Sequence, residues 1–259
     1  MTSGGVRVER KGPVTTVIMN RPEARNAVNG PAAAELYEAF DEFDKDDSAS
    51  VAVLWGDNGT FCAGADLKAF GTPDANSVHR TGPGPMGPSR MVLSKPVIAA
   101  VSGYAVAGGL ELALWCDMRV VEEEAIMGVF CRRWGVPLID GGTVRLPRIV
   151  GQGRALEITL TGRKVPAEEC LRIGLCEYVT PKGGARAKAE ELAQEIARFP
   201  QVCVRADRRS AIRSHGLGVR EALIQEWYNG RQALIEDGVA GATRFKSGLG
   251  RHGDFEKIR

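Results

Sequence analysis

Short apolar runs bounded by turn residues recur along the first half of the chain. Residues 6–10 and 14–20 predict two strands, and the apolar run 51–55 predicts a third. Residues 95–103 predict another strand, and 118–129 predict a strand, a turn and a strand. The pattern therefore indicates a sheet built from several short, buried strands.

Helical patterns separate these strands. Over residues 29–46 the apolar positions Leu36, Phe40 and Phe43 recur at spacings of four and three, as on one face of a helix. Asn29 precedes this stretch and is a suitable N-cap. Because strands alternate with helices, we predict an α/β fold.

Beyond residue 150 the pattern becomes helical, so we expect an α/β core over 1–195 and a helical C-terminal region over 196–259. Residues 71–90 are rich in glycine and proline and predict a mobile loop.

Composition narrows the function classes. With 259 residues, 44% of them hydrophobic, the chain can bury a full core. A net charge of +2 argues against nucleic-acid binding. The six cysteines form no CxxC pair and the three histidines do not cluster with them, which predicts free thiols, no metal site and a cytoplasmic location. The N-terminus lacks the apolar segment of a secretory signal, and the apolar stretch 97–110 is too interrupted to span a membrane.

Two segments of small residues follow predicted strands, "FCAGADLKAF" at 61–70 and "VSGYAVAGGLELALWCD" at 101–117. Small side chains let a ligand approach the backbone, and the first N–H groups of a helix have no internal partner. Ala65 and Gly108 could therefore donate to one oxygen, although tight packing alone would also explain such turns. Glu111 lies one helical turn after Gly108 in an apolar segment, where a carboxylate is costly without a task or a partner.

Four stretches together resemble the crotonase superfamily, the enoyl-CoA hydratase/isomerase family. They are "NRPEARNAVN" (20–29), "FCAGADL" (61–67), "KPVIAAVSGYAVAGGLELALWCDMRV" (95–120) and "GGTVRLPRIVG" (141–151). The resemblance implies a spiral of ββα units, a C-terminal helical region used in trimer contacts, and an acyl-CoA thioester substrate. It implies no metal or redox cofactor.

The resemblance also implies roles for residues of this chain. The N–H groups of Ala65 and Gly108 would form the oxyanion hole for the thioester carbonyl, and Glu111 would act as acid/base. The residues expected to bind the CoA substrate are Ala24, Arg25 and Asn26 at its nucleotide end, and Ala63, Asp66, Leu67 and Lys68 along its length.

One position departs from the family pattern. Hydratases of the family use a second glutamate twenty residues after the first, where this chain has Cys131. A thiol with a pKa near about 8.5 is mostly protonated at neutral pH and replaces a carboxylate poorly. Cys131 either fills a small apolar space in the acyl site or takes part in catalysis.

Asp140 is the nearest candidate for a replacement acid. Dienoyl-CoA isomerases and chlorobenzoyl-CoA dehalogenases of the superfamily carry a working aspartate within about one position of it. Asp140 also precedes "GGT", so it could instead cap the next helix.

The sequence thus predicts an acyl-CoA enzyme of the enoyl-CoA hydratase type. The alternatives are an isomerase or another crotonase-type lyase or hydrolase, because of Cys131, or a non-catalytic acyl-CoA-binding paralogue. We expect a homotrimer or a dimer of trimers, with no nucleic-acid or membrane partner. The identity of the acyl chain stays open.

Overall fold

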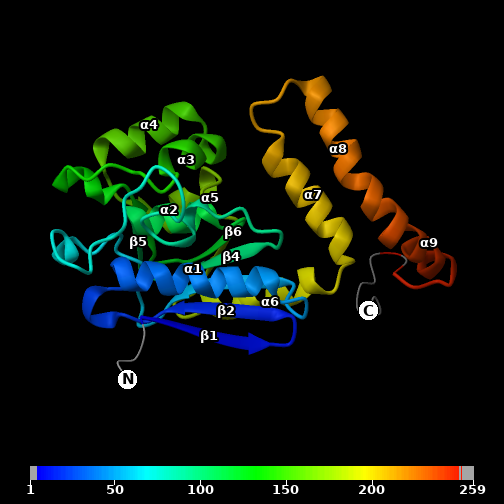
Figure 1. Cartoon of the computed structure of the whole chain (residues 1–259), viewed down its shortest axis with the longest axis horizontal. Helices are drawn as coiled ribbons and strands as arrows, with labels where there is room; N and C mark the ends of the chain where they lie inside the picture. Colours follow the sequence, from blue (N-terminus) through cyan, green and yellow to red (C-terminus); the bar gives the residue numbers. More distant parts are fainter. Residues whose placement is uncertain (1–4, 251, 253–259) are drawn as a thin grey trace.

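The computed structural model describes residues 5–250 and 252 and contains two sheets (Figure 1). The larger sheet has six strands, in the order β1 (Val6–Lys11), β2 (Val14–Met19), β3 (Val51–Gly56), β4 (Val97–Val101), β6 (Met118–Glu122) and β9 (Tyr178–Thr180). β1 is antiparallel to β2, and every other neighbouring pair is parallel. Parallel strands need crossover connections, which the helices provide.

A smaller sheet is formed by β5 (Tyr104–Val106), β7 (Ile126–Gly128) and β8 (Val165–Pro166). The chain enters the large sheet in β4, the small sheet in β5 and then helix α2 (Gly108–Trp115). It then enters the large sheet in β6 and the small sheet in β7, before α3 (Gly142–Val150). This repetition is the expected ββα order, and it places the start of α2 directly after the small sheet.

Helices cover both faces of the larger sheet. α1 (Gly30–Lys45) begins where the Asn29 side chain accepts a hydrogen bond from the Ala32 N–H at 3.1 Å, and it buries Leu36, Phe40 and Phe43. α6 (Ala185–Ala197) packs on the other face. Alternate residues of β3 belong to two separate apolar clusters, one shared with α1 and the other with α6. The predicted helix and its N-cap are confirmed.

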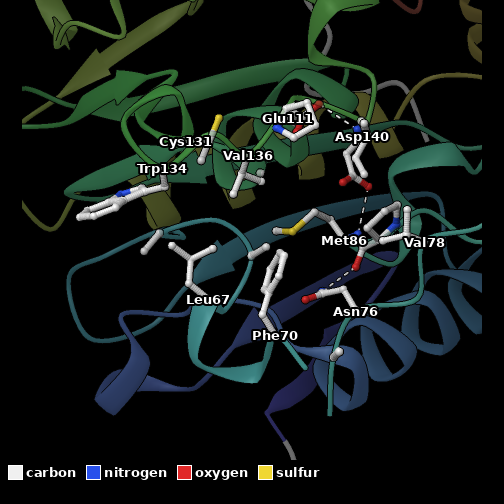
Figure 2. A pocket seen from close by; sticks show the side chains of 18 of the residues that line it. Leu67, Phe70, Asn76, Val78, Met86, Glu111, Cys131, Trp134, Val136 and Asp140 are labelled. Carbon is white, nitrogen blue, oxygen red and sulfur yellow. Dashed lines mark hydrogen bonds between the residues drawn. The ribbon is translucent and has the colours of Figure 1, made fainter. Parts of the chain in front are cut away.

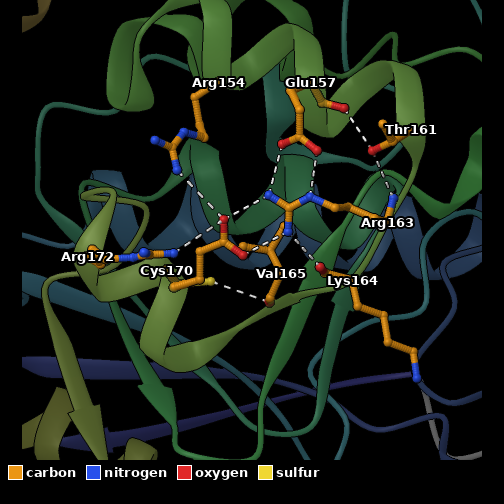
Figure 3. Close-up of polar contacts among 9 residues, drawn as sticks. Arg154, Glu157, Thr161, Arg163, Lys164, Val165, Cys170 and Arg172 are labelled. Atoms are coloured by element: carbon orange, nitrogen blue, oxygen red, sulfur yellow. Dashed lines mark hydrogen bonds and ion pairs between the residues drawn. The ribbon is translucent and has the colours of Figure 1, made fainter.

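Short helices connect the remaining elements: η1 (Pro22–Ala24), η2 (Leu67–Ala69), η3 (Pro88–Arg90), η4 (Phe130–Trp134), α4 (Gln152–Thr161) and α5 (Ala167–Arg172). Arg163 lies between the carboxylates of Glu157 on α4 and Glu169 on α5 (Figure 3). Arg133 of η4 donates to the Gly162 carbonyl at 3.3 Å, immediately before Arg163. These contacts hold η4, which carries Cys131, against the segment between α4 and α5.

The C-terminal helices α7 (Gln201–Arg213) and α8 (Val219–Ala233) pack as an antiparallel pair beside the sheets (Figure 1). The π-helix η5 (Leu234–Gly238) and α9 (Val239–Lys246) continue α8. Arg208 ties α7 to the core by donating to Asp117 at 2.9 Å and to the Leu93 carbonyl at 2.7 Å. The division of the chain at residue 195 stays a prediction, and its last residues, 251 and 253–259, lie outside the described residues.

The helical pattern beyond residue 150 did not predict two short strands, β8 and β9, which lie within the range predicted as α/β core. They have two and three residues, too few to show a periodic pattern, and they exist through pairing with β7 and β6. The glycine- and proline-rich loop contains η3 and a bridge between Gly84 and Gly87. Across residues 5–250, none of the helices is long and apolar enough to cross a membrane.

Candidate active site

Two small-residue turns meet at the edge of the smaller sheet. Cys62 pairs with Ala105, so the segment after β3 runs alongside β5. Gly64 has φ +100°, and a Cβ atom there would lie 2.9 Å from the Ala107 Cβ and 3.1 Å from the Gly108 nitrogen. Only glycine therefore lets the turn at 63–65 approach the start of α2 so closely.

Each turn presents a backbone N–H without a partner. Among the described residues, the N–H groups of Ala65 and Gly108 donate no hydrogen bond. Ala107 has φ 54° and ψ −124°, an unfavourable conformation for a residue with a Cβ, and its N–H donates to the Gly128 carbonyl at 2.9 Å. This strained residue turns the chain into α2 and leaves the Gly108 N–H available to an acceptor outside the helix.

Glu111 is buried one turn into α2. Its Oε1 accepts hydrogen bonds from the N–H groups of Asp140 at 2.9 Å and Gly142 at 2.8 Å. Burial raises the pKa of the carboxyl to about 7, although the hydrogen bond from Gly142 opposes the shift. The two N–H groups hold the carboxyl group in place. Both donate to Oε1, and neither donates to the second oxygen of Glu111, Oε2. A carboxyl that titrates near neutral pH can both take up and release a proton.

Asp140 lies beside Glu111, and its side chain does not cap the next helix. The N-cap of α3 is Gly141, which makes no side-chain hydrogen bond. The Asp140 Oδ1 accepts instead from the Met86 N–H at 2.9 Å and from the Ser89 hydroxyl. The cap hypothesis is therefore wrong, because the donors come from the 84–90 loop and not from α3. Burial raises the pKa of Asp140, against these hydrogen bonds.

Both carboxyl groups line one cavity of about 310 Å³ (Figure 2). Small residues from the two turns, Ala63, Ala65, Ala107 and Gly108, form part of its wall. Most of the remaining wall is apolar and is contributed by Leu67, Phe70, Val78, Met86, Phe130, Trp134, Val136 and Ile139. The cavity thus combines free N–H groups, two carboxyl groups and room for an apolar chain.

A second hollow of about 440 Å³ contains several of the residues predicted to bind substrate. Its lining residues are Arg21, Glu23, Ala24, Arg25, Asp66 and Lys68. Leu67 follows Asp66 in the chain and lines the larger cavity, so the same short segment borders both spaces. Arg21, which the sequence analysis did not single out, forms an ion pair with Asp66 at 3.0 Å.

Asn26 lies apart from the other predicted ligand residues because its side chain is buried and fully engaged. Its amide donates to the carbonyls of Asp57 at 2.9 Å and Thr60 at 2.6 Å, and its oxygen accepts from the Arg21 N–H at 2.8 Å. These bonds hold the 21–26 segment against the turn after β3. We therefore expect Asn26 to shape the site and not to touch the ligand. It holds the segment that contains Arg25, whose carbonyl accepts a hydrogen bond from the Ala63 N–H at 3.2 Å.

A sequence model of the enoyl-CoA hydratase/isomerase family matches residues 9–223. The chain belongs to the enoyl-CoA hydratase/isomerase family. Its relatives include the enoyl-CoA hydratase EchA19 of Mycobacterium tuberculosis, 36% identical over 89% of this chain and 88% of that protein. The 2,3-dehydroadipyl-CoA hydratase of Escherichia coli is 34% identical over 85% and 86% of the two chains.

Solved structures agree with this family assignment. The crystal structure of an enoyl-CoA hydratase from Mycobacterium tuberculosis superposes with a TM-score of 0.90, at 34% identity, over 95% of this chain and 96% of the other. The chain has the mixed α/β fold of this family, with its C-terminal helices. It is an enoyl-CoA hydratase-like enzyme that processes acyl-CoA.

Cys131 lies in η4 and lines the cavity that contains Glu111 (Figure 2). Burial, and then the charge of Glu111, raise the pKa of its thiol above the usual value. The thiol therefore stays protonated at neutral pH and offers no second base where hydratases of the family are expected to have a carboxylate.

Several residues of the site gave no usable sequence signal. Met86, Ser89 and Asn76 lie in the 71–90 loop, where glycine and proline remove any periodic pattern. Arg145, in α3, donates to the carbonyls of Asp140 at 2.9 Å and Ser89 at 2.8 Å. Within the described residues, no three His, Cys, Asp or Glu side chains are grouped so as to hold a metal ion.

Proposed function

We propose that the chain binds the thioester carbonyl of an acyl-CoA at the N–H groups of Ala65 and Gly108, and that Glu111 moves a proton at the neighbouring carbon. The observation that carries this proposal is the arrangement around Glu111. A buried carboxyl with a pKa near 7 lies in the same cavity as two unpartnered N–H groups on touching turns.

The two N–H groups would stabilise the negative charge that develops on the thioester oxygen. Backbone donors fixed before the reaction cost no reorganisation, and one such donor contributes about 3 kcal/mol to transition-state stabilisation. With the oxygen held in this way, Glu111 can take a proton from water as the water oxygen adds to the β-carbon of an enoyl thioester. It then returns a proton to the α-carbon.

The CoA moiety would extend over the hollow beside Arg25 and Lys68. The cationic side chains of Arg21, Arg25 and Lys68 line this hollow together with two carboxylates. CoA carries phosphates, and a local group of cations attracts them although the whole chain is nearly neutral. The proposed ligand residues are those of the sequence analysis, with Arg21 added and Asn26 acting through the backbone.

Ligand binding provides the first test. We expect CoA thioesters, at concentrations well above their Kd, to raise the Tm, because about 2.7 kcal/mol of stabilisation follows at one hundred times the Kd. Thermal shift with straight-chain, branched and aromatic acyl-CoAs measures this, with the corresponding free acids as controls. An unchanged Tm with every thioester at millimolar concentration contradicts the CoA site.

Double-bond isomerisation is a second candidate activity, and the position of Asp140 favours it. Isomerisation moves a proton between two carbons of the acyl chain and needs no second group to activate water. Asp140 borders the same cavity as Glu111, and only its Oδ1 is engaged by Met86 and Ser89. Asp140 could therefore exchange a proton at the more distant carbon.

Asp140→Asn separates this activity from a structural role. If Asp140 carries the proton, we expect isomerisation of a β,γ-enoyl-CoA to fall at least about 100-fold, since one acid–base group contributes 10²–10⁴-fold. The Tm should change little, because an asparagine oxygen can still accept both hydrogen bonds. The control is Ser89→Ala, which keeps the carboxyl and should mainly lower the Tm. A normal rate with a lower Tm in Asp140→Asn would make Asp140 only an anchor for the 84–90 loop.

The C-terminal helices support the predicted assembly. Large apolar side chains more than half exposed lie along α8, η5 and α9, namely Val219, Leu223, Trp227, Tyr228, Leu234, Ile235, Val239 and Phe245. Exposed apolar surface of this extent is typical of a protein–protein interface. We therefore propose that these helices contact other copies in a trimer or a dimer of trimers.

Light scattering at micromolar concentration tests the assembly. We expect three or six times the 27.8 kDa mass of one chain. Replacing Trp227 with glutamate should reduce this mass, because a buried charge opposes association. Lys182→Glu, at a side chain that is 74% exposed before α6, is the control and should leave the mass unchanged. A wild-type monomer would contradict the proposal.

A further inference from the structure

Asn76 is a polar residue in the wall of the apolar cavity, and the proposed proton transfer leaves it unused. Its Nδ2 donates to the carbonyl of Val28 at 3.0 Å and to that of Pro85 at 2.8 Å. Because both partners can only accept, the amide nitrogen has to face them. The orientation of the whole group is therefore fixed, and so is the position of its oxygen.

The Asn76 Oδ1 is buried and accepts no hydrogen bond from any described residue. A buried acceptor without a donor is unfavourable, and it is rare in folded proteins. Phe70, Val78 and Met86 form the apolar wall around this part of the cavity and have no side-chain donor. A ligand in the cavity that carries a donor would satisfy this oxygen once the side chains that cover it move aside.

The position of Asn76 indicates which part of a substrate would reach it. Figure 2 shows Leu67 and Trp134 on one side of the pocket and Asn76 and Val78 on the other. Leu67 stands between Asp66 and Lys68, which line the hollow proposed for CoA, so Asn76 lies toward the end of the acyl chain. Phe70 and Val78 are more than half exposed, so both can move aside for a ligand at little cost.

We propose that Asn76 selects an acyl group that carries a hydrogen-bond donor, such as a hydroxyl, near its distal end. The inference rests on the proposed acyl-CoA site and names the class of its substrate. An apolar chain of equal length leaves the Asn76 Oδ1 unpaired. A hydroxyl donates to this oxygen and so exchanges its hydrogen bond with water for one with the protein. Discrimination of this kind comes from the protein acceptor that the wrong ligand leaves unpaired.

Matched pairs of ligands test the proposal. Saturated acyl-CoAs of four to eight carbons, each with and without a terminal hydroxyl, are compared by calorimetry with the wild-type protein. At one chain length we expect the hydroxylated form to bind at least about tenfold more tightly, because an unpaired buried acceptor is unfavourable by about that factor. Saturated ligands make the comparison independent of catalysis.

Asn76→Leu removes the acceptor and keeps the size of the side chain, and it should reduce the preference to less than about twofold. A purely structural loss would weaken both members of each pair equally and leave their ratio unchanged. Val78→Ala, in the same wall, is the control and should keep the preference. Equal binding of both members by the wild type at every length overturns the role of Asn76 alone. Binding of neither member at any length overturns the acyl-CoA site as well.

Discussion

Glu111→Gln should lower the turnover of the enoyl-CoA that the protein converts fastest by about 10²–10⁴-fold, because one general acid–base group contributes that much. Glutamine has nearly the same shape, and its oxygen can still accept from the Asp140 and Gly142 N–H groups that hold Glu111. The loss therefore reports the missing proton transfer. Initial rates are measured at saturating substrate concentration, and the Kd of an unreactive acyl-CoA without a double bond is measured separately. Together they distinguish a loss of proton transfer from weaker binding.

The same substitution should stabilise the protein at alkaline pH. The Glu111 pKa is about 7 in the folded state, against about 4.5 when unfolded. Between these two pH values Glu111 is protonated in the folded state and ionised in the unfolded state. The free energy of unfolding of the wild type therefore falls as the pH rises from 4.5 to 7, and it stays low above pH 7. Glutamine avoids this loss, which is on the order of 3 kcal/mol.

Thermal unfolding at pH 5 and pH 8 measures this effect. The Tm of Glu111→Gln should exceed that of the wild type at pH 8 and nearly equal it at pH 5. Glu38→Gln, on α1, is the control and should show no such change, because Glu38 is not buried. A variant that keeps wild-type turnover would remove Glu111 from the mechanism, whatever its stability.

Cys131→Glu should raise the hydration of crotonyl-CoA at least about 100-fold. The wild type should hydrate this substrate at least about a hundredfold more slowly than a hydratase with two glutamates, because the protonated thiol does not activate water. Cys131 lines the same cavity as Glu111, so a glutamate there could hold the water from the other side. Loss of the enoyl thioester absorbance gives the rate.

Two further variants of Cys131 serve as controls. Cys131→Gln has the shape of the glutamate variant without its charge, and it should stay as slow as the wild type. Cys131→Ala should leave the natural activity nearly unchanged if the thiol only fills space. Rapid hydration by the wild type, or an equal gain in Cys131→Gln, would contradict this interpretation of the missing carboxylate.

Local features of the fold could be predicted from the sequence, because they depend on neighbouring residues. The α1 N-cap at Asn29 and the start of α2 at Gly108 follow from side-chain type and short-range spacing. β8 and β9 could not be predicted in this way, because strands of two and three residues are defined by their partners.

The residues of the site also fall into two groups, those with a local sequence signature and those whose partners are distant in the sequence. The Gly64–Ala65 and Gly108–Glu111 segments have a local signature, because a close approach of two backbones requires small residues. The hydrogen bonds of Asp140 come from Met86 and Ser89, more than fifty residues earlier. The sequence around Asp140 suggested a helix cap because it contains no information about these distant donors. Asn76 was missed for the same reason.

Exchange of the α-proton of a saturated acyl-CoA with solvent tests the central claim most directly. It requires an oxyanion site and one base, and it is independent of Cys131 and of the natural substrate. In D₂O we expect the wild type to incorporate deuterium next to the thioester carbonyl, detected by mass spectrometry, and Glu111→Gln to lose this exchange. If the wild type binds the thioester but incorporates no deuterium, or if Glu111→Gln exchanges as fast, then Glu111 does not move the proton at that carbon.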